Sequence, residues 1–244
     1  MTQIVTLSLF RFDSLLSRLW ALKMMGLARP MMARVPDIGF WKLCGSGTGE
    51  GFTPLPNTGV YAILATWPDM ATARARTGGE AGSAAVFNRY RVRASEDWTL
   101  YMRPTSARGD WAGVQPFETG PETTPGPLAV LTRATVKPSR AARFWRRVPD
   151  ISARIGADPN VLFKIGIGEV PLLHQVTFSV WPDAATVAQF ARTGPHAEAI
   201  RAVRDEGWFR EELYARFAIA GESGRWSDAA PIASPPHLPQ RDEI

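Results

Sequence analysis

The sequence predicts an α+β fold in which two ferredoxin-like βαββαβ repeats form a body like a dimeric α/β barrel. Three observations support this prediction. Short motifs recur in the same order in both halves, each half reads strand, helix, strand, strand, helix, strand, and a Pro, Gly and Thr-rich segment separates the halves. The chain has 244 residues, 45% hydrophobic and 21% charged, which is ordinary for a globular protein.

Five pairs of motifs carry the internal similarity. They are Val35–Ile38 with Val148–Ile151, Phe40–Leu43 with Leu162–Ile165, Trp67–Asp69 with Trp181–Asp183, Glu96–Trp98 with Glu206–Trp208, and Gly109–Trp111 with Gly224–Trp226. Each pair alone is weak, but five pairs in one order are hard to attribute to chance. We therefore predict an internal duplication. The predicted parts are a first repeat over 1–119, a linker over 120–127, a second repeat over 128–228 and a Pro-rich tail over 229–244.

The first repeat opens with a strand over 4–10, where β-branched and aromatic residues are frequent. Asp13 and Ser14 can cap a helix over 15–27, and Pro30 and Pro36 mark its exit. The other predicted elements are strands over 39–45 and 60–66, a short helix after the first Trp-Pro-Asp motif, a helix over 84–95 and a strand over 98–103.

The second repeat follows the same order. Its predicted elements are a strand over 128–136, a helix over 138–155, strands over 161–168 and 174–181, helices over 184–192 and 195–208, and a strand over 215–220. In both repeats the aspartate of the Trp-Pro-Asp motif, Asp69 or Asp183, is expected to cap the next helix. This order gives antiparallel sheets with helices on one face.

The composition excludes several classes of protein. Because Cys44 is the one cysteine, neither an internal disulfide nor a Cys-rich zinc site can form, and a reducing cytoplasm is expected. The N-terminus lacks signal-peptide features, and no apolar run reaches about 18 residues, so no transmembrane helix is expected. The net charge is +5, but the arginines are scattered, so we predict a solvated basic surface and no nucleic-acid partner.

The segment Leu15–Met32 is rich in leucine and methionine and also contains Arg18, Lys23 and Arg29. The simplest interpretation is an ordinary first helix packed on the sheet. The alternative is an amphipathic helix that makes the protein peripheral on the inner face of the membrane.

The Gly-rich stretch Gly45–Gly51 resembles a phosphate loop but lacks the third glycine of a dinucleotide fingerprint, and no P-loop lysine follows. A strand end or bulge explains it, and its glycines could let the backbone approach a large planar ligand. Gly-x-Ser-x-Gly and His-Glu-x-x-His motifs are absent from the sequence, and no catalytic residue can be assigned. A cofactor that brings its own chemistry suits such a sequence.

His196 is the predicted metal ligand. It begins a predicted helix and shares an apolar face with Ile200 and Val203, so its imidazole should point at the sheet. A neutral imidazole in that position is a suitable axial ligand for haem iron. The alternative for His196 is a core histidine bonded to a backbone carbonyl. His174 and a thiolate at Cys44 remain open as other iron ligands, although a structural histidine and a buried core thiol are the simpler interpretations.

The stretches Ser8–Asp13, Phe40–Pro54 and Leu64–Asp69 resemble the spheroidene monooxygenase family, the acyclic carotenoid 2-ketolases of carotenoid biosynthesis in purple photosynthetic bacteria. The resemblance covers nearly the whole chain, and its Gly-rich stretch is fairly specific. It implies oxidation of C2 of an acyclic carotenoid such as spheroidene to a ketone, with O₂ and reduced ferredoxin, by a haem protein unlike cytochromes P450. No catalytic residue is carried over by the resemblance.

We therefore expect a haem-dependent carotenoid monooxygenase. Haem would lie between the sheet and the second-half helix, with His196 on the iron. Lys42 and Lys164, which occupy matching strand positions, would pair with the propionates unless they are solvated strand ends. The rival interpretations are a haem-free ligand-binding or interaction module and a cofactor-independent monooxygenase of the ferredoxin-like superfamily.

Overall fold

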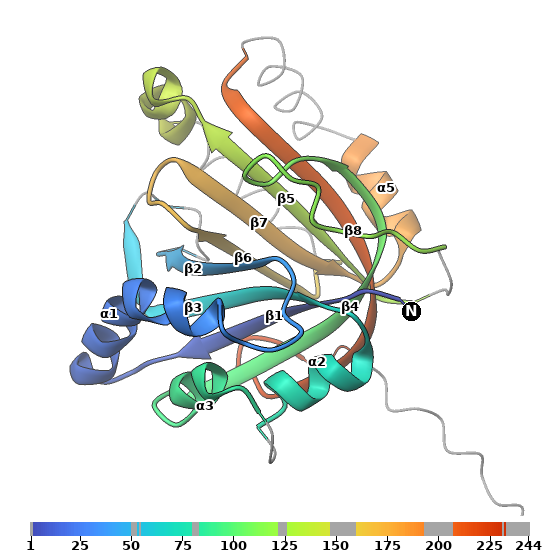
Figure 1. Ribbon diagram of the computed structural model, residues 1–244. Coiled ribbons are helices and arrows are strands. Elements are labelled where there is room, and N and C mark those ends of the chain that lie inside the picture. Colours follow the sequence, from blue (N-terminus) through green and yellow to red (C-terminus); the bar gives the residue numbers. More distant parts are fainter. Residues whose placement is uncertain are drawn as a thin grey trace, which may run out of the picture.

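The computed structural model describes residues 2–49, 53, 55–79, 83–121, 126–146, 160–192, 207–230 and 232. Its strands close into one antiparallel barrel in the order β1, β3, β2, β6, β7, β5, β8, β4 (Figure 1). Their bounds are β1 Ile4–Arg11, β2 Trp41–Gly47, β3 Pro56–Trp67, β4 Glu96–Gly109, β5 Leu128–Val136, β6 Phe163–Gly168, β7 His174–Trp181 and β8 Phe209–Gly224. The predicted α+β class with an antiparallel sheet is confirmed.

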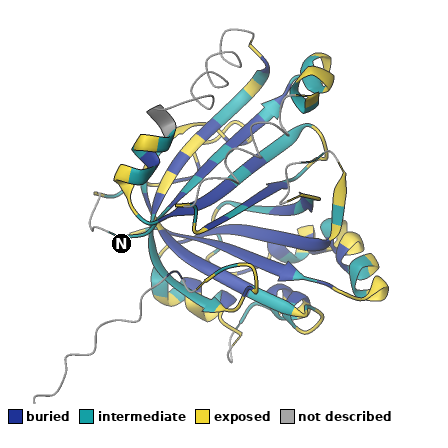
Figure 2. Cartoon of the chain, turned by 180° about the vertical axis from the view of Figure 1, so that it is seen from behind, coloured by how far each residue is buried: buried dark blue, intermediate teal, exposed yellow. Residues whose placement is uncertain are grey.

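Helices lie outside the barrel. Their bounds are α1 Leu15–Met32, α2 Met70–Thr77, α3 Ala85–Arg91, a 3₁₀ turn η1 Pro138–Arg140 that continues helically over 141–146, and α5 Ala184–Arg192. Met24 of α1 and Phe87 and Tyr90 of α3 pack on outward side chains of β1 and β3. In Figure 2 strands β1 and β3 are mostly buried, the second-half strands carry many intermediate residues, and exposed residues gather on the outward sides of the helices. Within the described residues, no helix combines the length and apolarity that crossing a bilayer requires.

The two halves of the chain have the same strand order. Residues 4–109 contribute the run β4, β1, β3, β2 and residues 128–224 contribute β8, β5, β7, β6, which is the ferredoxin-like order in both cases. The halves join where β4 pairs with β8 along most of its length, and where β2 pairs with β6 through only two residue pairs. The shared order agrees with the predicted duplication, which itself stays a prediction.

Side chains fill the interior of the barrel. Inward residues of every strand meet in one core, in which Trp98 packs edge-on against Phe163 and Phe117 packs edge-on against Phe217. An eight-stranded barrel has an interior about wide enough for its own side chains. A large ligand must therefore bind elsewhere, on the outer face beneath the helices.

Several element boundaries differ from the predictions. The closing strands β4 and β8 are far longer than the predicted 98–103 and 215–220, because they cross the whole barrel and pair with each other. Of the helix predicted over 195–208, residues 195–206 lie outside the described residues. Its last two residues, Gly207 and Trp208, are described and are not helical. The predicted caps are confirmed: Ser14, Asp69 and Asp183 accept the backbone N–H of Ser17, Thr72 and Thr186.

Both closing strands end in a glycine that turns the chain across an open end of the barrel. Gly109 and Gly224 have φ values of 94° and 78°. A Cβ at Gly109 would lie 2.1 Å from the carbonyl oxygen of Glu212, and a Cβ at Gly224 would lie 2.2 Å from that of Asp97. Glycine is thus required at both turns because of backbone conformation and because of space.

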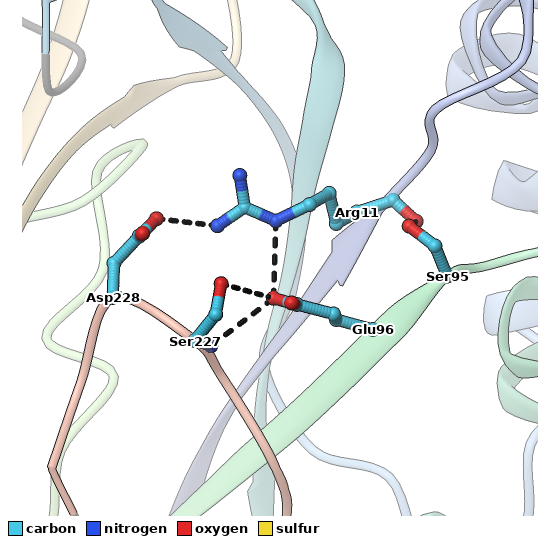
Figure 3. Close-up of polar contacts among 5 residues, drawn as sticks. All are labelled: Arg11, Ser95, Glu96, Ser227 and Asp228. Atoms are coloured by element: carbon cyan, nitrogen blue, oxygen red, sulfur yellow. Dashed lines mark hydrogen bonds and ion pairs between the residues drawn. The ribbon is translucent and has the colours of Figure 1, made fainter.

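A buried tryptophan and an Arg–Glu pair follow each turn. In the turn after Gly224 the buried tryptophan is Trp226. The backbone N–H of the next residue, Ser227, donates to the Glu96 carboxylate, which also accepts a hydrogen bond from Arg11 at 3.1 Å (Figure 3). The Arg11 guanidinium also binds Asp228 and lies 4.4 Å from the Trp226 ring centre. The turn after Gly224 thereby folds over one end of the barrel and closes it.

The other barrel end repeats these contacts. After Gly109 comes buried Trp111, and the next N–H, of Ala112, donates to Glu211, which pairs with Arg133. Contact by contact, Glu211 therefore takes the place of Glu96. The sequence match instead pairs Glu96 with Glu206, which lies outside the described residues, whereas the match of Gly109–Trp111 with Gly224–Trp226 agrees with this register.

We predict that Gly224→Ala lowers the free energy of unfolding by about 2 kcal/mol or more, because it combines an unfavourable φ with a clash against Asp97. Urea unfolding followed by circular dichroism measures the change. Gly45→Ala is the matched control, since a Cβ there meets no atom within 4 Å. Equal stability of the two variants would contradict this role of the turn.

Candidate functional site

A cluster of charged residues lies inside the barrel at the end closed by Trp111. It consists of Lys42, Arg133, Glu169, His174 and Glu211, and is called the interior cluster below. Strand alternation brings these residues together: Lys42, Arg133 and Glu211 each lie two residues before or after an inward core residue of the same strand.

The charges of the interior cluster are paired with each other. Lys42 Nζ lies 3.1 Å from Glu169 Oε2, and the indole N–H of Trp111 donates to the other oxygen of Glu169 at 2.5 Å. Arg133, whose side chain is only 2% exposed, pairs with Glu211 and lies 5.8 Å from the Trp111 ring centre. Charges that are paired in this way favour a structural role, because removal of one partner would leave the other as an unpaired buried charge.

His174 and Cys44 both belong to the interior. Burial lowers the pKa of His174, which is therefore neutral at pH 7, and its Nδ1 is buried without a hydrogen-bond partner among the described residues. Burial, followed by the nearby Glu169 carboxylate, raises the pKa of the Cys44 thiol far above neutrality. Cys44 therefore stays a thiol within the packed core, which disfavours a thiolate ligand at that position.

A pocket of about 390 Å³ lies on the outer face of the second-half sheet and is called the second-sheet pocket. Outward residues of β5, β7 and β8 form its floor, and Val187 and Phe190 of α5 line it with Trp181. Arg108 and Arg216, both exposed, are its cations. The volume falls within the range of about 300–1,000 Å³ that is usual for small-molecule sites.

The predicted site residues lie at different places relative to this pocket. His196 lies outside the described residues, in the segment 193–206 that follows α5 directly in sequence. Lys164 pairs in register with Ser179, which lines the pocket, so Lys164 belongs to the same outer face. Lys42 pairs with Leu64 of the interior core and points inward. The two lysines thus face opposite sides of the barrel wall, because their aligned positions are displaced by one residue.

A second pocket, of about 230 Å³, lies where β2 meets β6 and is called the seam pocket. Its floor includes Gly45, Gly47 and Gly168, and Leu22, Leu55 and Leu172 are among its apolar walls. The β2–β3 register shifts between Gly45 and Ser46, so the strand pairing is irregular within the Gly-rich stretch, where a strand end or bulge was predicted. The missing side chains leave this part of the barrel wall open to a ligand.

Strand β7 connects the two pockets. Gln175 lines the seam pocket, and Thr177, the next residue on the same face, lines the second-sheet pocket. Adjacent same-face residues of a strand are roughly 6.6 Å apart, twice the rise per residue. A long ligand on the outer face of β7 could therefore contact both pockets.

The second-sheet pocket fits a planar cofactor that carries carboxylates. Its walls are chiefly apolar and aromatic, and Arg108, Arg216 and the neighbouring Lys164 supply cations for two carboxylates. Among the described residues, no group of three or more His, Cys, Asp or Glu side chains is placed to hold a bare metal ion. The interior cluster, by contrast, is filled by Trp111 and its ion pairs.

The chain is similar over most of its length to three curated proteins named spheroidene monooxygenase. The one from Cereibacter sphaeroides is 51% identical over 233 residues, covering 94% of this chain and 71% of the relative. The one from Rhodobacter capsulatus is 51% identical over 235 residues, covering 95% and 96%. The one from Rubrivivax gelatinosus is 34% identical over 215 residues, covering 86% and 80%. No family model matches the chain.

Among solved structures, an aldoxime dehydratase in complex with butyraldoxime is similar to this chain with a TM-score of 0.58. The sequences are 11% identical, and the match covers 89% of this chain and 80% of the dehydratase chain. At this level of identity the similarity concerns the fold alone.

We predict that Glu211→Gln destabilises the protein at pH 7 by about 1–3 kcal/mol, because Arg133 would lose its charged partner. Burial alone would raise the pKa of Glu211, but the N–H groups of Gly113 and Ala112 and the charge of Arg133 lower it overall. A lowered pKa stabilises the fold above the unfolded value, near 4.3, and this stabilisation is lost as pH falls through the folded pKa.

The difference in unfolding free energy between wild type and Glu211→Gln should therefore shrink as the pH falls from 5 towards 3. Urea unfolding at several pH values measures it. Glu118→Gln, at an exposed position, serves as the control. A difference that is constant with pH would be inconsistent with an ionised Glu211 in the fold.

Proposed function

The chain belongs to the spheroidene monooxygenase family, and from this premise we propose that it is an oxygen-using oxidoreductase acting on an acyclic carotenoid. The observation that carries the proposal is 51% identity to two proteins of that name over about 95% of the chain. We further propose spheroidene or a close relative as substrate, a keto group at C2 as product, and reduced ferredoxin as electron donor. Duplication of one ferredoxin-like unit, as origin of the two halves, is part of the same proposal.

Haem is the proposed cofactor, and the second-sheet pocket is its proposed site. His196 would be the iron ligand, since the segment that contains it follows α5, whose Val187 and Phe190 line this pocket. Arg108, Arg216 and Lys164 would pair with the propionates. Lys42 is a poorer partner than Lys164, because Lys42 points into the barrel beside Glu169 whereas Lys164 lies on the outer face. Bound haem would supply the O₂ chemistry that the side chains of this chain lack.

The chain's own residues would bind, orient and desolvate the substrate. Trp181, Val187 and Phe190 offer apolar and aromatic surface to a polyene and exclude water from its end. Thr132, Thr177 and Ser179 are hydroxyl residues in the same pocket. Their hydroxyls can hydrogen-bond an oxygen introduced into the substrate. A pocket that combines apolar surface with hydroxyl groups suits an apolar substrate that gains one oxygen function.

We predict that the purified protein shows a Soret absorbance band and oxidises spheroidene to a ketone with O₂ and reduced ferredoxin. His196→Ala should abolish or shift the band, because it removes the iron ligand. Absorbance spectra with and without dithionite and carbon monoxide, and product analysis by mass spectrometry, measure these outcomes.

His237→Ala, in the C-terminal tail, is the matched control and should leave the spectrum unchanged. An unchanged spectrum in His196→Ala would contradict His196 as the iron ligand. Oxidation of the carotenoid by protein without a Soret band would instead establish a cofactor-independent monooxygenase. Carotenoid binding without any oxidation would leave only the ligand-binding interpretation.

A further inference from the structure

Helix α1 presents an apolar face that none of the residues the structure describes covers. Met24 and Ala28 pack against the sheet, whereas Leu15, Leu16, Leu19, Leu22 and Leu27 are all more than half exposed. Scattered exposed leucines are common on soluble proteins, but five on the exposed side of one helix are unusual, and the exposed Lys23 lies among them. This set of five is called the leucine face.

The leucine face continues into the rim of the seam pocket. Leu22 belongs to both, and Met25 of the same helix also lines the pocket. Leu55, Val170 and Leu172 are exposed apolar residues from two other chain segments, and all three line the same pocket. In Figure 1, α1 lies at the left of the barrel, beside β3 and β2. An apolar surface and an apolar pocket therefore share one side of the molecule.

The charges on helix α1 itself have one sign. Helix α1 contains Arg18, Lys23 and Arg29 and no acidic residue, and Lys23 and Arg29 are exposed; the exposed Asp13 lies just before the helix. A symmetric dimer through this face would bring the cations of two such helices together with no acidic residue on either helix, which opposes association. An anionic lipid surface, in contrast, complements both the leucines and the cations.

We propose that the leucine face docks on the surface of a bilayer containing anionic lipids, and that the seam pocket is the entrance through which a long apolar substrate leaves the bilayer. This proposal rests on the proposed function, since only an apolar substrate needs such a route. From the seam pocket, the outer face of β7 leads by a single same-face step, Gln175 to Thr177, to the second-sheet pocket. The substrate would then reach the reaction site without crossing bulk water.

The test is co-sedimentation of the full chain, with haem bound, with vesicles of phosphatidylcholine alone or with phosphatidylglycerol added. Binding is expected to the anionic vesicles and to weaken at high salt.

Leu16→Ser with Leu19→Ser should reduce the partition coefficient about tenfold or more, because two leucines, 80% and 55% exposed, no longer enter the lipid. Lys23→Glu with Arg29→Glu should reduce binding to anionic vesicles only. Val114→Ser, at a half-exposed apolar residue outside the leucine face, is the matched control and should bind like wild type.

Circular dichroism and the Soret band establish that each variant is folded and loaded. Absence of vesicle binding by the wild type, or equal binding by the double leucine variant, would overturn the docking proposal. So would a dimer, seen by light scattering, that the leucine variant abolishes. Oxidation of carotenoid in detergent micelles is measured on the same samples. Micellar activity without vesicle binding refutes docking and leaves the function standing, whereas vesicle binding without activity supports docking and refutes the function.

Discussion

Closure of the barrel by β4 and β8 is the constraint on which the rest of the structure depends. The two strands pair along nearly their whole length, and each ends in a glycine whose turn carries a tryptophan over a barrel end. Trp111 and Trp226 are then fixed by carboxylates that accept N–H groups from the turns, Glu211 and Glu96. Because the interior is filled in this way, the positions left for a ligand lie on the outer face of the sheets.

The two halves share this framework but differ in what covers their outer faces. The first-half sheet is covered by α1, α2 and α3 through a hydrophobic cluster rich in aromatic side chains. The second-half sheet carries the second-sheet pocket beside α5, and the seam between β2 and β6 carries the other pocket. The weak β2–β6 seam, with two residue pairs, and its glycines supply an opening that a fully paired barrel wall would lack.

Much of this architecture follows from local sequence patterns, and the rest depends on register. The caps at Ser14, Asp69 and Asp183 and the irregular pairing near Gly45 were predictable from residue type alone. The interior cluster was not, because Lys42, Arg133 and Glu211 near strand ends look like solvated charges until strand alternation is traced through the closed barrel. The same register shows that Lys42 and Lys164 face opposite ways, a distinction that a shift of one residue reverses. The matching glycines at 109 and 224 were the usable signal for the closing turns.

The central claim is that ligand chemistry takes place on the outer face of the second-half sheet and not inside the barrel. Thr177→Trp tests it most directly, since Thr177 lies on the floor of the second-sheet pocket and a tryptophan there would fill the space. The measurement is a haem titration of the refolded apoprotein, followed by absorbance, with carotenoid turnover on the same sample. A folded variant that neither retains haem nor oxidises carotenoid is the predicted result; a variant that does both like wild type would contradict the account.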